Sequence, residues 1–189
     1  MRASHPTLVA ASRAIAAQRE VMISRWSEWL GDRMTSSRVV SRALVERQLG
    51  LILDVLAAMV GPLRRETKPI WARVTEHYGR IAAARGLAAG EVVEEMQYLR
   101  EVLIRYLAPS IVALRPRQGM ALLLRLNRLV DRGVAMAVVG YTDALVHTLI
   151  PSDGSRGNGA PTVDPADFSR DLETIGDALG EVVASAGGR

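Results

Sequence analysis

The chain has 189 residues, enough for one domain and an attached tail, and a net charge of +4. Apolar residues make up 49% of it but aromatic residues only 4%, so the core must consist mainly of Ala, Leu and Val, which favours helices over sheets. The absence of cysteine excludes disulfides and thiolate metal sites, and it suits a reducing cytoplasm. The 24 basic residues, all arginine except Lys68, are spread along the chain, which argues against nucleic-acid binding because a nucleic-acid binder has a concentrated basic face.

No segment has the pattern of a membrane span or of a secretory signal. The most apolar part of the last long predicted helix, Gly133–Thr142, has only ten residues and lies between Arg132 and Asp143, whereas a span needs about 20. Within Met1–Glu20, charged and polar residues interrupt every apolar stretch. We therefore expect a cytoplasmic protein that does not enter a membrane.

Two helices are predicted in the first third of the chain. The first extends from about Thr7 to Met34, because apolar residues recur there at helical spacing: Ile15, Met22, Trp26 and Trp29. The second follows Ser36-Ser37, which are good N-cap residues, and reaches about Val60. Gly61-Pro62 stops it.

The third and fourth predicted helices lie on either side of Gly86. The third begins near Pro69, a residue suited to a first helical turn, and Gly86 is a plausible C-terminal cap for it. Its apolar face includes a histidine: Ile70, Val74, His77, Ile81 and Ala84. The fourth begins around Glu91, whose carboxylate the helix dipole favours, and Pro109 should kink or end it.

The fifth predicted helix, about Pro116 to Leu149, is long for a small domain, at roughly 50 Å. Its apolar face changes from large to small residues along the chain: Leu122, Leu126, Leu129, Gly133, Ala137, Gly140 and Ala144. The small residues allow another helix to approach closely. Tight packing inside the bundle is the favoured interpretation, and a dimer seam is the alternative.

A linker and a short amphipathic helix are predicted after residue 150. Residues 151–163 are rich in Gly, Ser and Pro, which is typical of a flexible linker between a domain at 1–150 and a helix at 164–189. The helix has a continuous apolar stripe that we expect to bind a partner or the bundle itself: Phe168, Leu172, Ile175, Leu179 and Val182. So short a helix is marginal alone in water, so it must dock on something.

No catalytic or metal-binding motif is visible. The chain has no nucleophile elbow, P-loop or Gly-rich dinucleotide fingerprint, and its three histidines lack metal-ligand spacing. His77 is a candidate axial ligand for haem because it lies on an apolar helix face. The favoured alternative is a core histidine that is hydrogen-bonded to a neighbouring group. We therefore expect no enzyme activity, no metal and no obligatory cofactor.

Four polar residues border the apolar faces of the third and fourth predicted helices: His77, Arg85, Glu95 and Arg100. Charged residues at such borders often only extend to solvent, but an arginine beside a core can also pair with a buried carboxylate. We hypothesise that the four residues form a polar latch between the two helices.

Several short motifs in this region resemble the RsbRD-type N-terminal sensor domain, the input domain of RsbT co-antagonist proteins and of some sensor histidine kinases. In chain order, the motifs that carry the resemblance are His77-Tyr78-Gly79-Arg80, Arg85-Gly86, Glu91-Val92-Val93-Glu94-Glu95, Leu99-Arg100, Leu126-Asn127-Arg128-Leu129-Val130-Asp131 and Tyr141. The resemblance covers about residues 10 to 150. It implies an all-helical, globin-like or bundle sensor domain, usually dimeric and without an obligatory cofactor, that controls an output module.

These observations together predict an all-α domain of about five long helices plus the short C-terminal helix. No output domain follows residue 150, so we expect a sensory or regulatory adaptor that binds a separate protein, such as a kinase or regulator, and that forms a homodimer. Two alternatives remain. One is a sensor or carrier of haem or another tetrapyrrole, and the other is a DNA-binding regulator.

Overall fold

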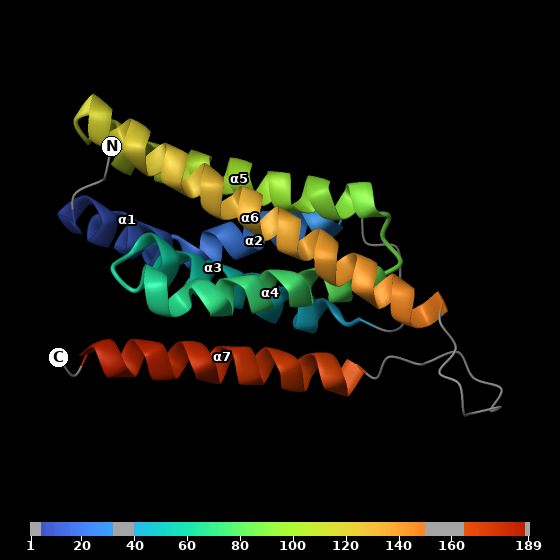
Figure 1. Ribbon diagram of the computed structural model, residues 1–189. Coiled ribbons are helices and arrows are strands. Elements are labelled where there is room, and N and C mark those ends of the chain that lie inside the picture. The colour runs from blue at the N-terminus through green and yellow to red at the C-terminus, as the bar shows by residue number, and fades with distance from the viewer. Residues whose placement is uncertain (1–4, 32–39, 150–164, 188–189) are drawn as a thin grey trace.

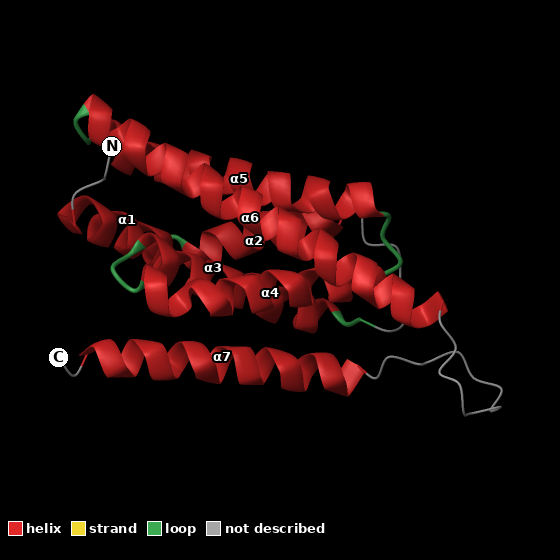
Figure 2. Cartoon of the chain, viewed as in Figure 1, coloured by secondary structure: helices red, strands yellow, loops and turns green. Residues whose placement is uncertain are grey.

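The computed structural model describes residues 5–31, 40–149 and 165–187, and over these ranges the chain forms seven helices and no strand (Figures 1 and 2). The predicted all-α class is therefore confirmed. The helices are α1 (His5–Ala17), α2 (Arg19–Gly31), α3 (Arg42–Val60), α4 (Arg64–Ala84), α5 (Ala89–Val112), α6 (Pro116–Leu149) and α7 (Pro165–Gly187). Among the described residues, no helix combines the length and hydropathy that a bilayer crossing requires.

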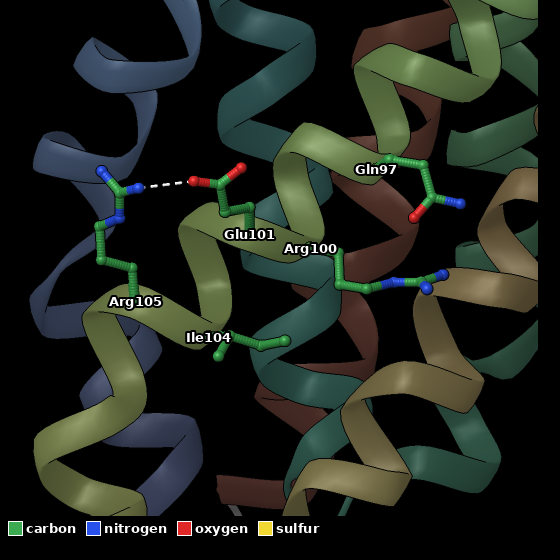
Figure 3. A pocket seen from close by; sticks show the side chains of 5 residues that line it. All are labelled: Gln97, Arg100, Glu101, Ile104 and Arg105. Carbon is green, nitrogen blue, oxygen red and sulfur yellow. Dashed lines mark hydrogen bonds and ion pairs between the residues drawn. The ribbon is translucent and has the colours of Figure 1, made fainter.

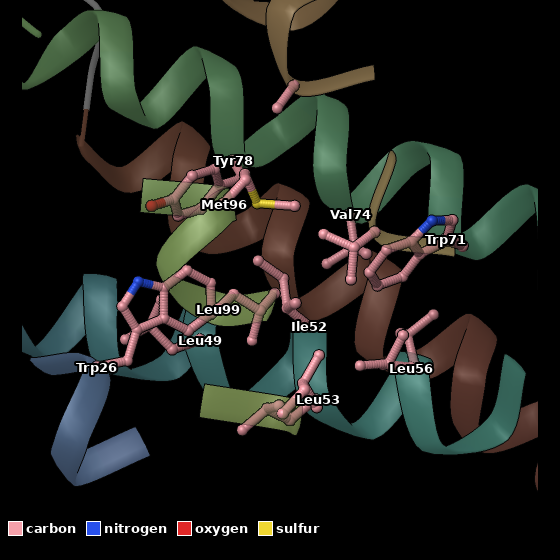
Figure 4. Close-up of a cluster of buried hydrophobic side chains, with 14 of the residues drawn as sticks. Trp26, Leu49, Ile52, Leu53, Leu56, Trp71, Val74, Tyr78, Met96 and Leu99 are labelled. Carbon is pink, nitrogen blue, oxygen red and sulfur yellow. The ribbon is translucent and has the colours of Figure 1, made fainter. Parts of the chain in front are cut away.

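The first six helices surround a shared core, and α7 lies along one side of it, against α4 and α3 (Figure 1). The core contains large side chains from several helices, including Trp26 of α2, Leu53 of α3, Trp71 of α4 and Leu99 of α5 (Figure 4). Each of these four is at most 1% exposed. Burial of this apolar surface is the main force that holds the bundle together.

The predicted first helix, about Thr7 to Met34, is two helices in the structure. The chain turns at Gln18, between α1 and α2, although no proline or glycine lies there. Both halves pack on α3, and Arg19 at the start of α2 donates to both carboxylate oxygens of Asp54, at 2.7 and 3.0 Å. The break therefore coincides with tertiary contacts, and the local sequence carries no signal for it. The predicted count of five long helices is wrong, because the described residues form seven helices.

Other predicted boundaries also differ from the structure. The N-cap of α3 is Ser41, whose hydroxyl accepts from the Leu44 N–H at 3.2 Å, while Ser36-Ser37 lie outside the described residues. Helix α4 begins at Arg64, before Pro69, because the hydroxyl of Thr67 and its N–H both bond the Leu63 carbonyl and hold the first turn.

At the C-terminal ends the agreement is better. Helix α4 ends with Gly86 at φ +80°, a left-handed conformation that favours glycine. Helix α5 continues through Pro109 to Val112, so the predicted kink does not end it there. Helix α6 has the predicted bounds. Helix α7 begins at Pro165, within the predicted range 164–189, and its 23 residues, about 35 Å, make it longer than the short helix expected.

Two glycines allow α4 and α6 to touch along their backbones. A Cβ atom on Gly79 would lie 1.8 Å from the Ala137 carbonyl oxygen, and one on Gly140 would lie 2.0 Å from the Glu76 carbonyl oxygen. The small-residue face of α6 is thus occupied by α4 within the chain, which is the intramolecular packing that the sequence favoured. The two helices run in the same direction and are linked in sequence by α5 (Figure 1).

Candidate functional site

The structure distributes the four residues of the predicted polar latch over three places. Arg85 and Glu95 are paired with each other. Arg100 instead pairs with Asp131 of α6, at the surface. His77 points toward α3 and α7 and belongs to a separate polar group. The four residues therefore do not form one cluster, because the side chains of His77 and Arg100 point away from the Arg85–Glu95 pair and contact Gln48 and Asp131 instead.

Arg85 and Glu95 form a two-pronged ion pair that is closed off from solvent. The two guanidinium Nη atoms donate to the two carboxylate oxygens at 2.9 and 2.7 Å, and the side chains are 2% and 3% exposed. Arg85 is the C-cap residue of α4 and Glu95 lies in the second turn of α5. The pair therefore ties the end of one helix to the start of the next by a planar, charge-assisted contact.

Tyr78 is the third member of this group, which we call the buried triad: Tyr78, Arg85 and Glu95. Its hydroxyl donates to Oε2 of Glu95. Burial, and after it the charge of Glu95, raises the pKa of Tyr78 well above its usual value, so the phenol stays protonated and remains a donor. Burial alone lowers the pKa of Arg85, but the hydrogen bonds and charge of Glu95 outweigh burial and raise it. Tyr78 and Arg85 thus both keep the protons that they donate to Glu95.

Sequence reasoning missed Tyr78, although a signal for it was present. Tyr78 lies seven positions before Arg85, two turns along the same helix face, so the two side chains point in the same direction. Its ring also packs against the buried Trp26 ring of α2, with centroids 5.8 Å apart. The triad is therefore in contact with the core from α2 to α5, where a rearrangement would change helix packing.

His77 is fully buried and held by Gln48 of α3. The Gln48 side-chain amide donates to the Val74 carbonyl at 2.9 Å, which directs its oxygen toward Nδ1 of His77, 2.7 Å away. Nδ1 must then carry the proton, and Nε2 is left as an acceptor that has no hydrogen-bond partner. The favoured interpretation of His77, a core histidine bonded to a neighbour, matches this arrangement.

The surroundings of His77 keep its ring neutral. Burial and, after it, the charge of Arg80 lower its pKa to about 4, although Asp171 and the Phe168 backbone act in the opposite direction. Asp171 and Phe168 belong to α7. The Phe168 ring meets the imidazole edge-on, at 5.8 Å between centroids and 82° between planes. The environment of His77 therefore depends on where α7 lies.

Helix α7 covers this histidine with the apolar stripe that the sequence predicted. Phe168, Leu172 and Ile175 are buried, and Leu179 and Val182 are half-buried against the same core. Two ion pairs flank the stripe: Asp171 with Arg80 at 3.1 Å, and Glu173 with Arg47 at 3.3 Å. We call the surface of α3 and α4 beneath these side chains the α7 groove.

Two shallow hollows lie on the described surface. One lies on α5, where Arg105 donates to Glu101 at 2.5 Å and where Gln97, Arg100 and Ile104 complete the lining (Figure 3). Another lies between α4 and α7, beside the Arg80–Asp171 ion pair. Within the described ranges, no three His, Asp or Glu side chains gather closely enough to hold a metal ion.

No protein-family model, curated protein or solved structure matches the chain. A function for the chain has to be inferred from the geometry of its two polar groups and of α7.

Proposed function

We propose that this chain is a non-enzymatic regulatory adaptor that acts by protein–protein interaction, and that the α7 groove is the surface that its partner occupies. The observation that carries the proposal is that α7 docks through one short stripe of apolar anchors. Phe168, Leu172 and Ile175 are spaced four and three positions apart, which is the pattern of an amphipathic helix in a hydrophobic groove. A partner helix with the same pattern fits the same surface.

The contacts around the stripe are of a kind that can be exchanged. Both flanking ion pairs join partly exposed side chains, and such pairs contribute about 0–1 kcal/mol each. The Arg80 side chain and the neutral His77 ring remain in place on α4 whether α7 or another helix covers them. Exchange of α7 for a partner therefore leaves the groove itself intact.

The buried triad supports the sensory part of the proposal. A signal can change output only if it binds two packing states of the protein with different affinity. Tyr78, Arg85 and Glu95 link α4 to α5 at the point where both also meet the core, so a shift of either helix must break contacts to a buried charge. Such a contact favours two discrete arrangements over a gradual deformation.

The resemblance to the RsbRD-type sensor domain adds three further parts to the proposal. It is the ground for a globin-like arrangement of the bundle, for a homodimer and for a cytoplasmic kinase or regulator as partner. The motifs that carry the resemblance include Tyr78, Arg85 and Glu95, the three members of the buried triad.

The groove is tested with a fluorescently labelled peptide that has the α7 sequence, Pro165–Gly187. We expect saturable binding to a full-length Phe168→Asp/Leu172→Asp variant, in which charged side chains prevent the chain's own α7 from docking. We expect much weaker binding to the unmodified chain, because a tethered helix competes at an effective concentration in the mM range. Fluorescence anisotropy measures both.

Two controls make the result specific. A labelled peptide with Phe168→Asp should bind neither protein, and circular dichroism should show that the full-length variant keeps its helices. If the folded variant fails to bind the unmodified peptide, the groove is not an exchangeable helix site and the proposal is wrong.

A further inference from the structure

The parallel course of α4 and α6 brings together seven basic residues from the first turns of α4 and the first half of α6. We call the surface that they form the basic stripe: Arg64, Arg65 and Lys68 of α4, with Arg117, Arg125, Arg128 and Arg132 of α6. Arg125 is half-buried and the other six are exposed. The argument against nucleic-acid binding rested on the spread of arginines along the sequence, but folding gathers these residues.

Helical spacing places the four α6 arginines on one face. At 3.6 residues per turn, Arg117, Arg125, Arg128 and Arg132 lie within an arc of about 80°. The two rows meet at Arg125 of α6, whose guanidinium donates to the Met59 carbonyl at the end of α3, five residues before Arg64 begins α4. Burial and the nearby charge of Arg64 accordingly lower the pKa of Arg125. The stripe is therefore one continuous surface rather than two separate runs.

The charge of the stripe is not neutralised within the described residues. None of its seven side chains is ion-paired to a described carboxylate, whereas Arg42 and Arg105 elsewhere pair with carboxylates of their own helices. Asp131, the one acid between Arg117 and Arg132 on α6, pairs with Arg100 on the side facing α5.

Arg125 retains unused hydrogen-bonding capacity. Its Nη2 donates to the Met59 carbonyl at the end of α3, at 3.2 Å, and its buried Nε has no partner. An anion bound at Arg125 offsets the repulsion between Arg125 and Arg64 and accepts a hydrogen bond from Nε of Arg125. The local arrangement thus favours an anionic ligand over a second protein surface of mixed charge.

We propose that the basic stripe binds the phosphodiester backbone of a nucleic acid duplex without reading its base sequence. Guanidinium groups bond phosphate oxygens with two donors at a time. From Arg117 to Arg132 the row on α6 is about 22 Å long, which matches about six phosphate steps of one strand at about 3.4 Å.

The surroundings of the stripe favour a duplex over a single strand. The aromatic residues of α4 and α6, Trp71, Tyr78 and Tyr141, are buried, so the stripe lacks the exposed stacking platform with which proteins hold single-stranded bases. Met120 and Leu124 are the exposed large apolar side chains on the described stretch of α6 from Arg117 to Arg132, and no Trp or Phe of the kind that anchors helices in a bilayer interface accompanies them. This surface is separate from the α7 groove, so the inference does not depend on the proposed function.

The test measures binding of the full chain to a labelled mixed-sequence DNA duplex of about 20 base pairs, by fluorescence anisotropy from about 50 to 200 mM salt. We expect an apparent Kd that rises steeply and linearly with salt on logarithmic axes. An Arg128→Gln/Arg132→Gln variant should bind about tenfold more weakly, with a slope smaller by about 2, because each lost phosphate contact removes about 0.9.

The matched control is Arg42→Gln/Arg105→Gln, which removes the same net charge from exposed arginines that are already paired. It should leave affinity and slope unchanged. The inference is overturned by absence of saturable duplex binding, or by equal losses in both variants, which would mean that only net charge matters. Binding to phosphatidylserine vesicles that needs Arg128 and Arg132, without duplex binding, would overturn it in favour of a membrane surface.

Discussion

Glu95 accepts three hydrogen bonds from two side chains, and almost no water reaches any of them. Glu95→Met or Arg85→Met should each lower the free energy of unfolding by about 3–5 kcal/mol, because the charge of the remaining partner stays buried without its counter-charge. The double variant Arg85→Met/Glu95→Met should recover part of this loss. Urea denaturation of the four proteins gives the coupling between the two residues, which we expect at about 1–3 kcal/mol.

A second double-mutant cycle, on the exposed pair of Arg100 and Asp131, serves as the comparison for the cycle on Arg85 and Glu95. Their side chains are 26% and 61% exposed, so solvent screens them and the pair should contribute less than about 1 kcal/mol. Similar coupling in the two cycles, or none between Arg85 and Glu95, would contradict the interpretation of the buried triad as a latch.

His77 should make the docking of α7 depend on pH. Its pKa is about 4 beneath α7, against about 6.5 for a histidine in water, so the undocked state binds the proton more tightly. Docking is then fully stable above a pH of about 6.5 and weakens as the pH falls toward 4, by about 3 kcal/mol in all. NMR spectra of the full chain, recorded across this range, follow the α7 signals.

The groups around the ring determine the control for this pH dependence. Arg80 of α4 and Asp171 of α7 carry charge, and they pair with each other, while Gln48 of α3 is neutral. A His77→Gln variant keeps these neighbours and removes the titrating group. If α7 is released over the same pH range in that variant, another group is responsible.

At the scale of the elements, the contact between α4 and α6 depends on the absence of side chains. Gly140→Ala should destabilise the fold by at least about 1–3 kcal/mol, because the added methyl would overlap the Glu76 backbone and push the helices apart. Gly176→Ala in α7 is the control, since a Cβ there meets no atom within 4 Å and should stabilise the helix by about 0.5–1 kcal/mol. Urea denaturation measures the free energy of unfolding of both variants. Equal values for Gly140→Ala and the unmodified chain would contradict the prediction, because they would show that α4 and α6 can move apart without loss of stability.

The helix boundaries show which elements were predictable from local sequence. Gly86 ends α4 because its positive φ suits glycine alone, and this local rule held. Gln18 breaks a continuous helical pattern without a proline or glycine, so no local rule could find it. The contacts that accompany the break, from Arg19 to Asp54, span 35 residues and follow only from the fold.

For the whole molecule, periodicity identified which residues are buried but not which residues they meet. Arg85 and Glu95 were predicted near each other because each borders the apolar face of its own helix, on either side of Gly86. Arg100 borders its face in the same way, yet its partner Asp131 lies 31 positions away on a helix whose register no local pattern defines. The basic stripe was missed for the same reason, because it exists only when α4 and α6 lie side by side.

Charge is divided unequally between the parts of the fold. Helix α7 carries Asp167, Asp171, Glu173, Asp177 and Glu181 against a single arginine, whereas the basic stripe is uncompensated. When a duplex is bound, the acidic helix α7 and the phosphate backbone of the duplex therefore lie on neighbouring sides of α4. Salt should weaken duplex binding and leave the apolar anchoring of α7 largely unchanged.

The order in which the chain is made gives the parallel pairing of α4 and α6 a further consequence. Helices that follow each other in sequence can pair as soon as both leave the ribosome, but Gly79 of α4 has to wait until α5 and then most of α6 have been synthesised. Helix α7 is synthesised after both of them. On the nascent chain, the α7 groove is therefore complete and open before the segment that covers it exists, and a waiting partner could bind there first.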